Sequence, residues 1–137
     1  MIVSRVDLPG YNEGDSQTKM SYDISLHDPI TKDDLLLDDP HFIRGGTYCV
    51  GGTRELHLNI TWNYAPHFQK VLGPKGIRVL YGMTGAESIC VIWAAMTLLQ
   101  DDIDPDYWTS TEGNAKAALA GLLAFAQLRP DGIWNGD

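Results

Sequence analysis

Hydrophobic and polar residues alternate strictly in two stretches of the first half of the chain. Residues 20–26 place Met, Tyr, Ile and Leu at every second position, and residues 55–61 do the same with two leucines and an isoleucine. A period of two is typical of a β-strand with one buried and one exposed face. We therefore predict two strands. The second should bury Leu56, Leu58 and Ile60 and expose Glu55, His57, Asn59 and Thr61.

Turn-forming residues after the first strand predict a hairpin. Residues 27–33, HDPITKD, are rich in turn formers, and Leu35-Leu36-Leu37 follows them. We expect this leucine run to return beside the 20–26 strand as its antiparallel partner. Asp38-Asp39-Pro40 should end it, because proline lacks the N–H that a ladder needs.

A glycine-rich stretch predicts a second hairpin. Gly51-Gly52 can supply the positive φ of a tight turn, so residues 47–50 should pair with the 55–61 strand. Gly45-Gly46 allows a bulge or a close approach of another backbone.

Helical periodicity dominates after residue 62. Residues 64–72 repeat apolar side chains at helical spacing, with Asn63 as the expected N-cap and Pro66 in the first turn. Thr84 and Glu87 form a capping box before a helix that reaches Leu99. Residues 75–82 are ambiguous between a strand and a helical turn, and we favour the turn.

A last helix is expected over residues 115–128, with Thr109 and Glu112 as a second capping box. Its small face, Ala117, Gly121 and Ala124, should let Ala94-Ala95 of the preceding helix approach closely. The tail, residues 131–137, has turn composition, and we expect Trp134 to tuck against the body.

Together these elements predict a single α+β domain over residues 1–137, with residues 1–19 as a loop or mobile N-terminal arm. An antiparallel sheet of three or four strands should pack against about three α-helices. The expected core consists of Ile24, Leu26, Leu56, Leu58, Ile60, Phe68, Ile89, Ile92, Met96, Leu119, Leu122 and Phe125.

Charge and hydropathy narrow the classes of function. A formal net charge of −8 and a pI near 4.7 argue against nucleic-acid binding, which relies on lysine and arginine to neutralise phosphates. The longest apolar run, residues 117–126, is too short to span a bilayer, and the N-terminus shows no signal sequence, so we expect a cytoplasmic protein without a membrane segment. Cys49 and Cys90 are expected as small core residues.

Metal and cofactor chemistry finds little support in the sequence. Residues 102–106 resemble the opening of a calcium loop, but Tyr107 and Gly113 stand where glycine and glutamate are required. His41, His57 and His67 lack the spacing of a zinc site. We therefore predict no metal and no cofactor, and treat 102–106 as a solvated connector.

A polar cluster offers one candidate ligand site around the glycine-rich hairpin and the following helix N-terminus. Two guanidiniums, a histidine base and a helix dipole are suited to an anionic ligand or to acid–base chemistry. The alternative is an exposed strand face with cross-strand charge pairs. The candidate residues are Arg44, Tyr48, Arg54, His57, Asn63 and His67.

Several short motifs between residues 22 and 137 carry a resemblance to a protein family. They are RGGTY, NITWNY, GIRVLYGMTGAESI, DPDYW, TEGNAKAAL and RPDGIWNGD. Read together, they resemble a set of small uncharacterised proteins encoded by bacteriophages and prophages. The resemblance implies an intracellular phage origin and transfers neither an activity nor catalytic residues.

The leading functional expectation is a non-enzymatic protein-binding module whose partner is a host or phage protein. No nucleophile motif supports an enzyme, and the alternative is a small enzyme or anionic-ligand-binding domain using residues 44–64. We expect a monomer or a weak homo-oligomer. Tryptophan and tyrosine dominate interface hot spots, so the candidate anchors are Trp62, Tyr64, Tyr107, Trp108 and Trp134.

Overall fold

The computed structural model describes residues 21–43, 45–46 and 51–137, and within these ranges the chain forms an α+β fold. Five strands lie in two antiparallel sheets beside three α-helices, so the predicted fold class is confirmed. In chain order the elements are β1 Ser21–His27, β2 Leu36–His41, β3 Thr53–Glu55, β4 His57–Thr61, α1 Ala65–Leu72, α2 Gly85–Thr97, α3 Glu112–Leu128 and β5 Ile133–Gly136.

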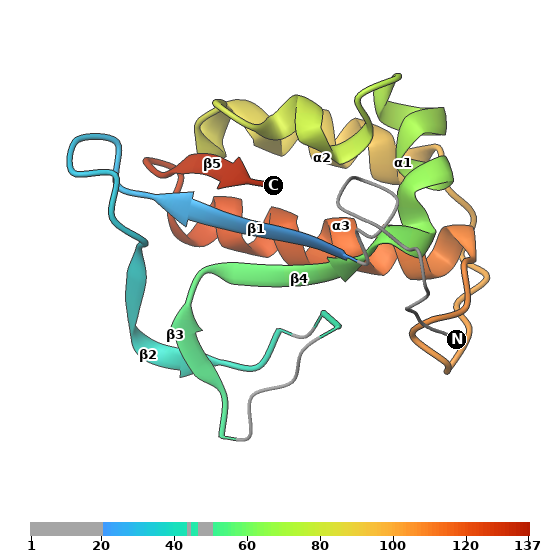
Figure 1. The fold of residues 1–137 in the computed structure, drawn as a ribbon, viewed down its shortest axis with the longest axis horizontal. Coiled ribbons are helices and arrows are strands. Elements are labelled where there is room, and N and C mark those ends of the chain that lie inside the picture. Colours follow the sequence, from blue (N-terminus) through green and yellow to red (C-terminus); the bar gives the residue numbers. More distant parts are fainter. Residues whose placement is uncertain (1–20, 44, 47–50) are drawn as a thin grey trace, which may run out of the picture.

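The larger sheet has the strand order β4-β1-β5, with β1 antiparallel to both neighbours. Tyr22 pairs with Ile60 on one side of β1, and Leu26 pairs with Trp134 on the other. Figure 1 shows α3 running behind this sheet, with α2 beside it and α1 at one end. The apolar side chains of β1 and β4 face these helices and form the core, as their alternation predicts.

The first predicted hairpin forms only next to its turn. His27 and Asp34 make an isolated antiparallel bridge, and the Leu35 N–H donates to the Leu26 carbonyl at 3.0 Å. Leu36 and Leu37 do not continue along β1, because β5 and β4 occupy its two edges. β2 instead pairs with β3 in the smaller sheet, which projects away from the helices in Figure 1. Asp38-Asp39-Pro40 lies inside β2 and does not end it, which a strand at a sheet edge tolerates.

The second predicted hairpin is described only in part. Residues 47–50 lie outside the described ranges, while Gly51 and Gly52 both adopt a φ of 84°, the positive value expected of them. The strand predicted over 55–61 is interrupted at Leu56, so that β3 belongs to the smaller sheet and β4 to the larger one. Thr61, expected on the exposed face, is buried.

Helix starts agree with the sequence at α2 and differ at α1 and α3. The Thr84–Glu87 capping box is present. Before α1, a 3₁₀ turn over Trp62–Tyr64 is capped by Thr61, so Asn63 is not an N-cap. The N-cap of α3 is Thr111, because the Thr109 N–H already bonds the Asp106 carbonyl in the preceding turn.

The segment left ambiguous by the sequence, around residues 75–82, forms a 3₁₀ helix over Gly76–Leu80, in agreement with the favoured turn. Ile77 and Leu80 of this helix are buried, so the turn contributes to the core as well as linking α1 to α2.

Helices α2 and α3 pack as the expected hairpin, but the close contact is elsewhere. A Cβ on Gly121 would meet Ile43 and Leu58, so this glycine faces the sheet side and not α2. A close backbone approach occurs at Gly85, where an added Cβ would lie 2.7 Å from the carbonyl oxygen of Arg129, the residue that follows α3.

The predicted core is buried except at Ile89 and Met96, which are half-buried. Cys90 is exposed on α2, contrary to expectation, and Cys49 lies outside the described residues. The tail forms strand β5 and is not a turn, which places the ring of Trp134 in the core at 1% exposure. Among the described helices, none combines the length and hydropathy needed to cross a bilayer.

Candidate functional site

The predicted ligand residues engage separate parts of the structure. The Arg54 Nε donates to the Leu37 carbonyl at 2.7 Å in the smaller sheet. His57 lies 3.5 Å from the Asp23 carboxylate on the exposed face of the larger sheet. Asn63 donates to the Trp108 carbonyl, and the His67 ring lies 3.3 Å from the Ser110 carbonyl oxygen. Arg44 and Tyr48 lie outside the described residues.

The surroundings of His57 match the alternative interpretation, an exposed strand face with cross-strand pairs. The Asn59 amide donates to the Ser21 hydroxyl at 2.9 Å and to the Asp23 carboxylate at 2.8 Å. These bonds tie β4 to β1 and engage the polar groups of that face.

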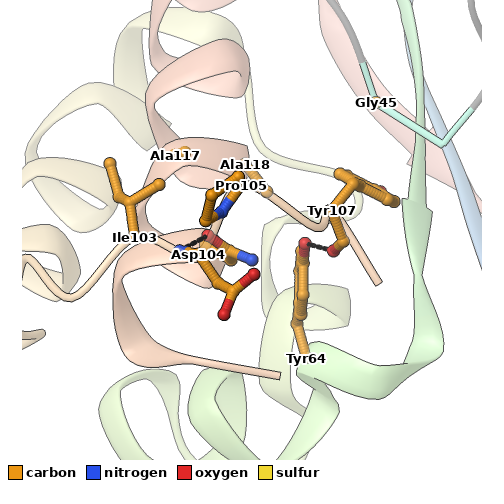
Figure 2. A pocket seen from close by; sticks show the side chains of 9 residues that line it. Gly45, Tyr64, Ile103, Asp104, Pro105, Tyr107, Ala117 and Ala118 are labelled. Atoms are coloured by element: carbon orange, nitrogen blue, oxygen red, sulfur yellow. Dashed lines mark hydrogen bonds between the residues drawn. The ribbon is translucent and has the colours of Figure 1, made fainter. Parts of the chain in front are cut away.

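A pocket of about 360 Å³ lies elsewhere, between the connector that follows α2, the start of α3 and the 3₁₀ turn before α1. None of the four described ligand candidates lines it. Its walls are mostly apolar and aromatic, with one carboxylate and one carboxamide (Figure 2). The lining residues are Gly45, Tyr64, Ile103, Asp104, Pro105, Tyr107, Asn114, Ala117 and Ala118.

Asn114 holds the connector in the shape that forms the pocket. Its side chain is buried in the first turn of α3, where its Oδ1 accepts from the Asp104 N–H at 2.9 Å. Its Nδ2 donates to the carbonyls of Asp106 at 3.1 Å and Thr109 at 2.9 Å. One carboxamide therefore satisfies three backbone groups of a segment without regular structure.

Two tyrosines build the opposite wall. The Tyr64 hydroxyl donates to the Tyr107 carbonyl, and the ring centroids lie 5.5 Å apart in an edge-to-face arrangement. The Tyr107 hydroxyl accepts from the Thr61 N–H at 2.9 Å and donates to the Asn59 carbonyl at 3.3 Å. This wall is therefore anchored to β4.

Gly45 closes the pocket next to β4. A Cβ on Gly45 would lie 1.9 Å from the Asn59 carbonyl oxygen, and the Gly46 N–H donates to that oxygen at 2.6 Å. The close backbone approach expected of Gly45-Gly46 is thus confirmed.

The pocket carries negative charge at its rim. Figure 2 shows the Asp104 carboxylate on the side toward the Tyr64 phenol. Within the described part of the chain, Asp102, Asp104 and Asp106 form no ion pair, although each accepts backbone N–H bonds, whereas Asp101 pairs with Lys116 at 2.6 Å. The three unpaired carboxylates give this connector an acidic surface.

The aromatic residues expected as protein anchors divide into two groups. Tyr64 and Trp134 are 0% and 1% exposed, so neither belongs to the outer surface: Trp134 stabilises the core, and Tyr64 forms an inner wall of the pocket. Trp62 is half-buried, with its ring 4.7 Å from that of Tyr22. Tyr107 walls the pocket, and Trp108 stands beside it with 53% of its surface exposed.

Sequence reasoning missed Asp104 and Asn114 as site residues. In the sequence, the repeated aspartates of the connector resemble only an incomplete calcium loop. An asparagine three residues after a threonine N-cap is a signal, because such a side chain readily bonds nearby backbone. The sequence does not show that the connector folds back over α3.

Comparison of the chain with known protein families, with curated proteins and with solved structures gave no match. Fold and pocket together define an α+β protein with an acidic, apolar-walled pocket, and its function is inferred from that geometry.

The tyrosines give the protein an alkaline limit of stability. Burial raises the pKa of Tyr64, Tyr107 and Tyr22, and raises that of Tyr81 to about 12. The pKa of these tyrosines is higher in the folded protein than the value of about 10 in the unfolded chain, so their protonated form stabilises the folded protein. This stabilisation is complete below pH 10. That contribution is lost as pH rises from 10 through 12.

We therefore expect the free energy of unfolding, measured in urea, to fall steadily above pH 10. Tyr81→Phe should make this decline shallower. A surface substitution that involves no tyrosine, such as Gln127→Ala, should leave the decline unaltered. A free energy that stays constant between pH 9 and 12 would contradict this account.

Proposed function

We propose that this chain is a non-enzymatic protein-binding module that receives a lysine or arginine side chain of its partner in the pocket at Asp104. Asp104 carries the proposal: its carboxylate lines an apolar-walled pocket and has no cation of the described chain beside it. A cationic side chain with an aliphatic stem complements both properties.

The walls suit such a side chain along its whole length. Lysine and arginine pack their methylene stems on apolar surface while the charged head reaches a polar partner. Ile103 and Pro105 supply the apolar surface, and Asp104 supplies the counter-charge. The exposed ring of Trp108 lies 5.0 Å from the ring of the lining residue Tyr107, and exposed tryptophans commonly contribute strongly to an interface.

Overall charge favours a basic partner as well. The chain has a net charge of −8, and the unpaired aspartates concentrate negative potential near the pocket. Complementary potentials accelerate encounter and select partners. In line with the phage resemblance of its sequence motifs, we propose a host or phage protein with a basic surface as the partner, acting in the cytoplasm.

The geometry gives less support to an anionic ligand or an enzyme. Asp104 would repel an anion, and the described lining residues include no nucleophile beside a base. The alternative site stays a prediction, and two of its residues, Arg54 and His57, lie in different sheets.

Short peptides that differ at one position test the proposal. Titration of the isotopically labelled protein with Gly-Arg-Gly or Gly-Lys-Gly amides should shift backbone NMR signals of residues 103–108 and 114–118. The matching norleucine peptide, which keeps the stem without the charge, should bind at least tenfold more weakly. We expect dissociation constants of about 1 mM for such fragments.

Variants make the assignment specific to the pocket. Asp104→Asn should weaken arginine-peptide binding about tenfold, equivalent to about 1.4 kcal/mol, and Trp108→Ala should weaken it several-fold. Asp38→Asn removes an exposed carboxylate on β2, away from the pocket, and should have no effect. Equal binding of the norleucine and arginine peptides, or shifts confined to other surfaces, would refute the proposal.

A further inference from the structure

Beyond their N-terminal turns, which contain Glu87, Glu112 and Lys116, the two long helices carry no charged side chain. No acidic or basic side chain occurs in residues 88–100 or in residues 117–128, although 20% of the chain is charged. These stretches cover most of α2 and most of α3. A helix that is apolar all round is normally buried on all sides.

Helix α2 nevertheless exposes one face. Cys90, Trp93, Ala94 and Thr97 recur at helical spacing and are all exposed, with Trp93 at 59% and Leu98 just beyond the helix at 63%. The opposite side of the same helix is buried in the core. The exposed apolar face of α2 therefore has no partner within the described chain.

Helix α3 extends this surface. Ala120, Gln127 and Leu128 are exposed, and Leu128 reaches 51%. The two helices pack along their lengths: Gly85 meets Arg129 at one end, and the Gln100 N–H bonds the Glu112 carboxylate at the other. Their exposed faces are thus neighbours, and we call them together the neutral helix surface, residues 90, 93, 94, 97, 98, 120, 127 and 128.

We infer that the neutral helix surface binds a second copy of this chain. Two copies with a net charge of −8 each repel one another across most orientations. A contact between two uncharged faces brings the fewest acidic groups together. A two-fold axis makes one such face self-complementary, because the same patch then serves both copies.

The size of the surface sets the strength of the contact. Two helices about 20 Å long and about 10 Å apart present a footprint of roughly 400 Å². Standard stable interfaces use roughly 800 Å² per partner. The dimer should therefore be weak and concentration-dependent, with a dissociation constant of about 0.1 mM.

Cys90 can be used to test how the two copies are oriented in the dimer. It lies near the middle of α2, so antiparallel packing of α2 on its copy brings the two Cys90 thiols close to the axis. A short thiol cross-linker applied to the Cys49→Ser protein should then join two copies, and the additional change Cys90→Ser should abolish the product.

Sedimentation equilibrium of the full chain tests the inference. The wild type should change from monomer to dimer between about 10 μM and 1 mM. Ala94→Glu and Ala120→Glu, both at exposed positions, should each weaken association at least tenfold while the melting temperature stays close to wild type. Ile30→Glu adds the same charge at an exposed turn outside this surface and should not alter association.

Two outcomes overturn the inference. One is a monomer throughout this concentration range, and the other is a dimer that both glutamate variants leave intact. Asp104→Asn should leave association unchanged, so this test and the peptide titration of the pocket succeed or fail independently.

Discussion

Trp134→Ala is expected to lower the free energy of unfolding by about 3–5 kcal/mol, the range for removing a large aromatic side chain from a core. The Trp134 ring is 1% exposed, and its indole N–H donates to the buried Ser88 hydroxyl at 2.7 Å. Its backbone pairs with Leu26 in the sheet and donates to the Met83 carbonyl. The substitution leaves a cavity where β5, β1 and α2 meet.

Urea denaturation followed by circular dichroism measures this loss. Trp134→Phe keeps most of the volume and removes the indole donor, so it should cost clearly less than the alanine variant. Trp108→Ala removes the same ring type from an exposed position and should change stability by less than about 1 kcal/mol. A similar loss for Trp134→Ala and Trp108→Ala would show that β5 is not packed as described.

Asn114→Asp is expected to destabilise the protein by about 2–4 kcal/mol despite its nearly identical shape. The Asn114 Nδ2 donates to two carbonyls, those of Asp106 and Thr109, and an ionised carboxylate cannot donate to either. Each carbonyl keeps one backbone donor, the Thr109 N–H for Asp106 and the Thr111 N–H for Thr109. The loss therefore consists of two amide bonds of about 0.5–1.5 kcal/mol each, together with the repulsion between the new carboxylate and the two carbonyl oxygens. The connector should detach from α3 and the pocket should lose its shape.

The matched control is Asn63→Asp, which removes a single amide bond to the Trp108 carbonyl at an exposed position. We expect it to cost less than about 1 kcal/mol. Because the pocket depends on the connector, Asn114→Asp should also abolish the NMR shifts caused by the arginine peptide. A stable Asn114→Asp protein with unaltered peptide binding would contradict the role given to this carboxamide.

Local patterns in the sequence predict much of the secondary structure. Alternation at Leu58 and Ile60 identifies the buried face of β4, and the Thr84–Glu87 pair marks the start of α2. Both signals depend on neighbours a few residues away. They are therefore readable without knowledge of the fold.

Strand partners were not predictable in the same way. The leucine run at 35–37 looks like the return strand of a hairpin, but β1 is flanked by β4 and by β5 from the end of the chain. That competition involves pairings more than 100 residues apart, such as Leu26 with Trp134. No local pattern reports it.

The candidate site was missed for a related reason. Histidine and arginine drew attention to residues 44–67, whereas the pocket depends on a connector folded over α3 by one asparagine. The contribution of Asn114 is visible only once the carbonyls that it meets are known.

Tyr107 covers part of the free edge of β4 as well as lining the pocket. β4 is an edge strand, and an unpaired edge readily recruits strands from other molecules. The outward Thr61 N–H and Asn59 carbonyl are occupied by the Tyr107 hydroxyl, and the Gly46 N–H shares the same carbonyl. A foreign strand finds these groups already bonded, so a substitution that reshapes the pocket at Tyr107 also uncovers a site for fibril-like growth.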